Sequence, residues 1–122
     1  MEIISWIVAT IFLIMALVAF ASPASVVSYF GVTDLSIDGR NEVRAVYGGF
    51  GLAVAGLVVV APYLPRFGPG IMLTVGGALL GMALGRAISR AVDGGAGFYP
   101  WLFFTIELVG GAALLTALMM MP

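Results

Sequence analysis

The chain has 122 residues, of which 62% are hydrophobic and only 9% are charged. A soluble domain usually contains about 25% charged residues, and a chain this small has too much surface to hide so much apolar area from water. A net charge of −1 argues against a nucleic-acid partner. The absence of cysteine and histidine excludes a disulfide framework and removes the commonest ligands of zinc and haem.

Four apolar stretches are each long enough to cross a bilayer as a helix, which takes about 20 residues. These stretches cover residues 3–21, 42–61, 70–91 and 101–120. The first is too long for the apolar core of a signal peptide and lacks a basic start, so it is expected to be a span. We predict an all-α integral membrane protein, a bundle of four transmembrane helices that forms a single domain over residues 1–122.

The connections between the spans differ in length and composition. Ser22 and Pro23 end the first span, and residues 24–30 are expected to form a short interfacial helix that Ser22 caps and Gly31 stops. Residues 32–41 are expected to be a polar loop, whereas a proline-rich turn and a glycine-rich turn join the later spans. Four spans place both termini on one side and the long loop and glycine-rich turn on the other.

Small residues recur at four-residue spacing on the second and third spans, a pattern that lets membrane helices approach closely. The rows are Ala45, Gly49 and Ala53, then Gly51 and Ala55, and on the third span Gly77, Gly81, Gly85 and Ser89. We expect these rows to pack against other helices of the same chain in a dense bundle. The alternative is that they form the seam of a homodimer.

A charged side chain inside a membrane costs free energy, so it is expected to have a partner of opposite charge or a functional role. Glu107 lies seven residues past Pro100, about 10 Å along its helix at about 1.5 Å per residue. The helix directions bring it to the same end of the bundle as Arg44 and Arg86. We expect Glu107 to accept hydrogen bonds from Arg44 or Arg86, with Tyr47 one turn deeper than Arg44.

One further arginine, Arg90, belongs to this five-residue candidate site. Arg90 follows Arg86 by four residues on the same helix face, and Asp93 continues that face. The resulting charge cluster has two interpretations. It is a salt bridge that joins three spans, or it is a site for a polar headgroup, an ion or a proton.

Several of these residues give the chain a resemblance to a known family. Residues 44–49 (RAVYGG) open the second span, residues 84–89 (LGRAIS) close the third, Asp93 and Gly94 follow, and Glu107 lies in the fourth. On these motifs the chain resembles a family of small four-helix bacterial membrane proteins that is classed as a domain of unknown function and is similar in outline to DoxX-like proteins. The resemblance covers most of the chain and implies a location in the bacterial inner membrane. It implies no activity, substrate or cofactor.

The expected function is that of a non-catalytic membrane protein, either an accessory subunit of a larger membrane assembly or a binder of a lipid-like molecule. Its expected partners are membrane lipid, other membrane subunits or a second copy of itself. No nucleophile and base stand at a catalytic spacing, so we predict no enzyme, no cofactor and no metal site. The alternative is a small dimeric transporter that uses Glu107 for proton or ion coupling, although the nearby arginines would repel cations.

The arginines also predict an orientation. Four of the five, namely Arg40, Arg44, Arg86 and Arg90, fall on the side of the long loop, and Arg66 falls on the side of the termini. Basic residues near a membrane favour the cytoplasmic side, so the count predicts periplasmic termini.

Overall fold

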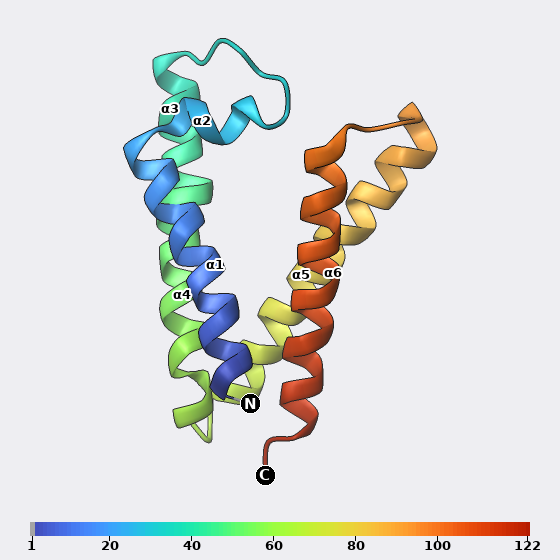
Figure 1. Cartoon of the computed structure of the whole chain (residues 1–122). Helices are drawn as coiled ribbons and strands as arrows, with labels where there is room; N and C mark the ends of the chain where they lie inside the picture. The colour runs from blue at the N-terminus through green and yellow to red at the C-terminus, as the bar shows by residue number, and fades with distance from the viewer. Residues whose placement is uncertain (1) are drawn as a thin grey trace.

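The computed structural model describes residues 2–122, and its four long helices form two hairpins (Figure 1). Helix α1 (Glu2–Ala21) packs against a helical run from Ile37 to Tyr63, and α5 (Gly68–Asp93) packs against α6 (Phe98–Met119). Each is long and apolar enough to cross a membrane. The described part of the chain contains no strand, so the predicted all-α class with four candidate spans is confirmed.

The second span is one continuous helical run built from four segments. They are α3 (Ile37–Val43), the π-helix η1 (Arg44–Gly49), α4 (Phe50–Val60) and the 3₁₀ turn η2 (Ala61–Tyr63). The predicted start at residue 42 is wrong, because residues 37–41 are helical rather than part of a loop. The hydroxyl of Ser36 accepts a hydrogen bond from the Gly39 N–H at 3.0 Å, which satisfies one of the unpaired donors at the helix start.

The short helix after the first span is α2 (Pro23–Ser28), with proline at its first position as predicted. Ser22 occupies the cap position, but its hydroxyl lies 2.6 Å from the Ser25 hydroxyl and makes no bond to a backbone N–H. Gly31, with φ of +79°, follows α2, and Gly94, with φ of +84°, ends α5. Glycine adopts this left-handed conformation without the steric cost that other residues meet, so both predicted stops are confirmed.

The two hairpins meet at the end of the molecule that holds the termini and diverge toward the loop end (Figure 1). Their shared core at the meeting point includes Val8 of α1, Val58 of α4, Met72 of α5 and Leu114 of α6. The hydroxyl of Ser5 also reaches the sulfur of Met72 at 3.9 Å, across the two hairpins. Apolar packing therefore joins the two hairpins at this end.

At the loop end the apolar core is smaller and stays within the first hairpin. Its buried members are Ala19 of α1, Val26 of α2 and Val43 of α3, and no residue of α5 or α6 belongs to it. The loop-end half of α5 and α6 is thus not joined to α1 and α4 by a hydrophobic core. The expectation of a dense bundle throughout is wrong, because the buried core that the two hairpins share is confined to the end with the termini.

Candidate functional site

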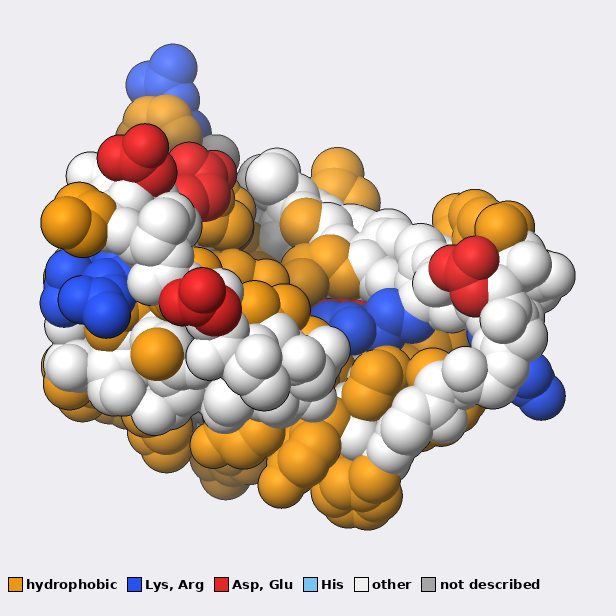
Figure 2. Space-filling model, turned by 90° about the horizontal axis from the view of Figure 1, so that it is seen from above, with side chains coloured by type: hydrophobic (Ala, Val, Ile, Leu, Met, Phe, Trp, Pro, Cys, Tyr) orange, Lys and Arg blue, Asp and Glu red, His pale blue; other side chains and the backbone are white. Residues whose placement is uncertain are grey.

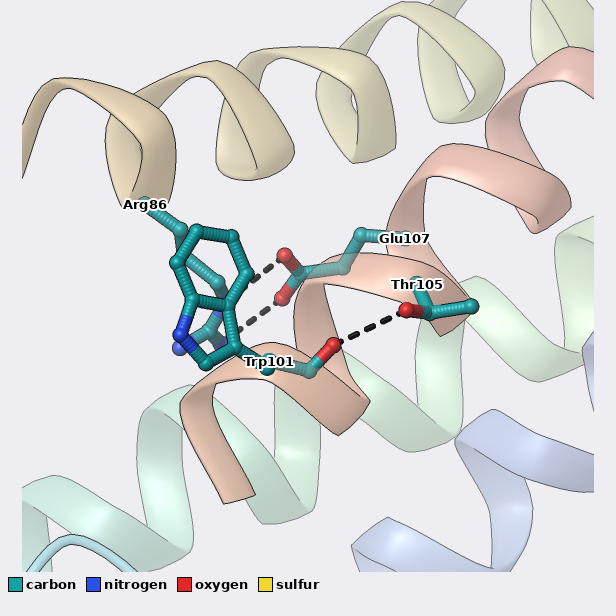
Figure 3. A network of polar contacts seen from close by, with 4 residues as sticks. All are labelled: Arg86, Trp101, Thr105 and Glu107. Carbon is teal, nitrogen blue, oxygen red and sulfur yellow. Dashed lines mark hydrogen bonds and ion pairs between the residues drawn. The ribbon is translucent and has the colours of Figure 1, made fainter. Parts of the chain in front are cut away.

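The buried Glu107 forms a two-pronged ion pair with Arg86 (Figure 3). Arg86 Nε donates to Glu107 Oε2 at 2.7 Å and Arg86 Nη2 donates to Glu107 Oε1 at 2.8 Å. Glu107 is only 5% exposed. Such paired, charge-assisted hydrogen bonds are short and fix the geometry of both side chains. The predicted pairing of Glu107 with Arg86 is confirmed, and it links α5 to α6.

A close contact between two glycines brings α5 and α6 together beside this pair. Gly111 lies one turn beyond Glu107, and a Cβ added there would lie 2.9 Å from the Gly76 carbonyl oxygen and from the Leu80 side chain. Only a residue without a side chain allows the helix axes to come this near. This contact was not predicted, although the adjacent Gly110 and Gly111 in an apolar helix were the available signal.

The other predicted partner, Arg44, does not reach Glu107. Its Nε donates to the Phe20 carbonyl oxygen at 3.2 Å, near the end of α1. The last carbonyls of a helix have no partner within the helix, so this arginine supplies one and the predicted Arg44–Glu107 pair is wrong. Tyr47, on η1, is partly buried against the loop-end core and within electrostatic range of Arg86.

Arg90 and Asp93 also lie outside the cluster. Both side chains are exposed near the end of α5, and the Arg86–Glu107 bridge is the only ion pair that the structure contains over residues 2–122. They follow Arg86 on the same face of α5 as predicted, but α5 and α6 separate toward the loop end (Figure 1). The predicted five-residue charge cluster is therefore reduced to one ion pair with Tyr47 nearby.

Aromatic side chains from the segment after α2 and from α6 lie against the Arg86 guanidinium. Its carbon Cζ lies 5.5 Å from the centre of the Phe103 ring and 5.9 Å from that of Phe30, distances at which a cation is attracted to an aromatic face. The rings of Phe30 and Phe103 are 5.5 Å apart, and those of Tyr29 and Tyr99 are 4.8 Å apart. The segment after α2 thus crosses to the second hairpin over Arg86, a contact that the sequence did not reveal.

Part of the Arg86 guanidinium stays open. Nε and Nη2 bond to Glu107, and no described residue accepts a hydrogen bond from Nη1. Every buried side-chain nitrogen and oxygen over residues 2–122 has a hydrogen-bond partner. Because Nη1 has none, it is accessible rather than buried. Arg86 is 25% exposed at its side chain. Viewed from the loop end, basic side-chain surface lies in the hollow between the two halves of the molecule (Figure 2).

A groove with a volume of about 370 Å³ runs between α1 and α6. Its lining includes Ile4, Ile7 and Ile11 on α1 and Ile106 and Val109 on α6. The polar side chain in the lining is Thr105, whose hydroxyl donates to the Trp101 carbonyl oxygen at 2.9 Å within α6 (Figure 3). The groove therefore presents an apolar surface to whatever enters it.

The rows of small residues divide into one that packs and two that do not. Gly51 and Ala55 are buried, and a Cβ added at Gly51 would lie 3.5 Å from Ala16 of α1, so this row packs within the chain as predicted, and its partner is α1. The other two rows are exposed, and their members are Ala45, Gly49 and Ala53 on the second span and Gly77, Gly81, Gly85 and Ser89 on α5.

The expectation that the α5 row packs within the chain is wrong. A Cβ added at Gly77, Gly81 or Gly85 would have no neighbour within 4 Å, because these positions lie on the side of α5 away from α6. The spacing of small residues identifies a ridge but not the helix that it meets. A contact with a second copy or another subunit remains a prediction.

Residues 2–122 contain no group of three or more acidic side chains that could hold a metal ion. The fold thus defines a class: a small all-α chain with four helices long and apolar enough to span a membrane, and one buried ion pair between the last two. Within that class, residues 1–118 match the family described as "Domain of unknown function (DUF4345)", and the chain belongs to this family. No curated protein and no solved structure matches the chain.

The predicted resemblance to a family of unknown function is thereby confirmed. The likeness to DoxX-like proteins and the bacterial origin stay predictions.

Proposed function

We propose that this chain is a non-catalytic membrane protein that binds one lipid-like molecule between its two hairpins. The polar head would lie at Arg86 and the apolar chain in the groove between α1 and α6. The observation that supports this proposal is the Arg86–Glu107 pair, which keeps an open N–H at membrane depth, while an apolar groove lies along the same stretch of α6 as Glu107.

The depth of Arg86 supplies the physical argument. Arg86 precedes the last residue of α5, Asp93, by seven residues, about 10 Å along the helix. A guanidinium N–H without an acceptor is expensive in the apolar part of a bilayer. A pair that served only to join α5 and α6 would be most stable if the packing closed over it. Nη1 instead stays accessible.

An accessory subunit of a larger assembly is the second candidate. The exposed ridge of Gly77, Gly81 and Gly85 supports it, because a helix face without side chains allows a neighbouring membrane helix to approach closely. The neighbour would be another membrane subunit or a second copy of this chain. Disulfide crosslinking of a Gly81→Cys variant in membranes tests the second copy, and the absence of a crosslinked dimer would count against it.

A dimeric transporter that couples to protons or cations through Glu107 has less support. Both carboxylate oxygens already accept hydrogen bonds from Arg86, so a cation would have to displace a guanidinium bound in two places. We place the protein in the bacterial inner membrane with periplasmic termini, on the motifs and the arginine distribution. Activity of a cytoplasm-only reporter fused to the C-terminus would contradict this orientation.

The lipid that copurifies with the protein tests the proposed function. We expect mass spectrometry to find one bound amphiphile on the wild type in micelles and none on the double variant Arg86→Met/Glu107→Gln. This variant loses both charges together, so it leaves no uncompensated buried ion and should still fold. Arg90→Met, which removes an exposed arginine one turn away, should keep the amphiphile. A folded double variant that retains the amphiphile would refute the proposal.

A further inference from the structure

We infer that the ligand is a neutral single-chain amphiphile whose head offers a hydrogen-bond acceptor such as an ester, ketone or hydroxyl oxygen, and not an anionic lipid. This inference rests on the proposed function and specifies the class of ligand. Its basis is the charge state of the Arg86–Glu107 pair, the lack of any second basic group bonded there and the dimensions of the groove.

The pair offers hydrogen-bond donors without a net charge. Glu107 neutralises Arg86 through both of its oxygens, and the open Nη1 belongs to the same guanidinium. An anion at Nη1 would be repelled by the Glu107 carboxylate, which offsets part of the attraction that the guanidinium exerts on it. It would also bring an unbalanced charge into the apolar part of the membrane, which is costly. A neutral acceptor satisfies Nη1 without either cost.

The surroundings of Arg86 do not supply a second positive charge. Arg44 is bound to the Phe20 carbonyl, and Arg90 is exposed near the end of α5. The nearest neighbours of the guanidinium besides Glu107 are the rings of Phe30 and Phe103, which pack well against an uncharged head. A phosphate site would typically offer several donors from separate basic or backbone groups, and one open arginine nitrogen does not.

The groove lies along α6 from Thr105 to Ala113, a stretch that includes the position of Glu107. Phe103, which contacts Arg86, lies one turn before Ile106, and Gly110 and Ala113 continue the same side of the helix at spacings of three to four residues. From Phe103 to Ala113 the helix rises about 15 Å at about 1.5 Å per residue. The groove walls over this length are apolar, with the Thr105 hydroxyl already bonded within α6. A head at Arg86 therefore places one hydrocarbon chain in the groove.

Competition between two lipids that differ in one phosphate tests the inference. The wild-type protein in micelles is mixed with equimolar 1-monooleoylglycerol and 1-oleoyl-lysophosphatidic acid, and native mass spectrometry measures each adduct. We expect the neutral lipid to exceed its phosphate at least tenfold. Equal adducts, or more phosphate, would overturn the inference while leaving the proposed function intact. If neither lipid forms an adduct, both are refuted.

Variants extend the same measurement. Glu107→Gln leaves Arg86 with a net positive charge, so the preference should reverse toward the phosphate. Glu42→Gln removes an exposed carboxylate at the loop end and should leave the preference unchanged. Val109→Trp fills the groove and should reduce both adducts equally, because it blocks the shared oleoyl chain. Should Glu107→Gln fail to fold, the wild-type ratio still decides the question.

Discussion

The two hairpins each place an arginine near the loop end, but the two arginines have different roles. In the first hairpin Arg44 is exposed and donates to the Phe20 carbonyl oxygen. In the second, Arg86 is partly buried and donates twice to the Glu107 carboxylate. The two arginines therefore differ in burial rather than in distance from the end of their helix. A carbonyl suffices for the exposed Arg44, whereas the partly buried Arg86 is paired with an opposite charge.

The hairpins also differ in what holds their helices together. In the first, small side chains such as Gly51 and Ala16 pack across α1 and α4, and the Phe20 ring covers Gly48. In the second, the Gly76–Gly111 approach and the ion pair act side by side. Loss of the charge pair should therefore weaken the packing of α5 against α6 and leave the first hairpin unchanged.

The largest effect is expected from breaking the ion pair on one side. Arg86→Met leaves the Glu107 carboxylate buried without a partner and should cost about 3–5 kcal/mol of unfolding free energy. The double variant Arg86→Met/Glu107→Gln should recover most of this loss, since it removes the desolvation cost together with the attraction. Chemical unfolding in micelles measures both. A double variant as unstable as the single one would show that the pair itself, rather than the unpaired charge, determines the stability.

A smaller effect is expected at the contact between Gly76 and Gly111. Gly111→Leu forces a side chain against the Gly76 carbonyl oxygen and should cost about 1–3 kcal/mol, as overpacking usually does. Gly81→Leu is the matched control, because its added side chain meets open space on the same pair of helices. Chemical unfolding in micelles measures the unfolding free energy of both variants. If Gly81→Leu is the more damaging change, the α5 ridge packs against a neighbour.

The comparison of the hairpins also shows which helix boundaries can be predicted from the sequence. Span lengths follow from runs of apolar residues, so three of the four predicted spans agree with the structure to within about three residues at each end. Residues 37–41 are polar because this part of the helix extends beyond the apolar run, and hydropathy alone could not assign it. The Ser36 cap was the missing signal.

For the site, depth and helix direction were enough to select Glu107 and two candidate arginines, but not to choose between them. That choice depends on the rotation of each helix about its axis. The π-helical turn at residues 44–49 changes the register of the second span, and residue spacing does not reveal it. The contact of Phe30 with Arg86 joins residues far apart in the chain, and a spacing pattern contains no information about such a pair.

The smallest effect is expected at Arg44. Arg44→Met removes one hydrogen bond to the Phe20 carbonyl and leaves that oxygen free to find water at the loop end, so the cost should be about 1 kcal/mol. Arg44→Lys keeps a donor and a positive charge near the end of α1, where a cation is favoured, and should recover part of that loss. Both variants should bind the amphiphile as the wild type does, because Arg44 has no contact with Glu107. The unfolding free energy and the lipid adduct are measured on the same samples. A loss as large as that of Arg86→Met, or a loss of the adduct, would mean that Arg44 turns toward the ion pair in the membrane and that the two arginines form one site.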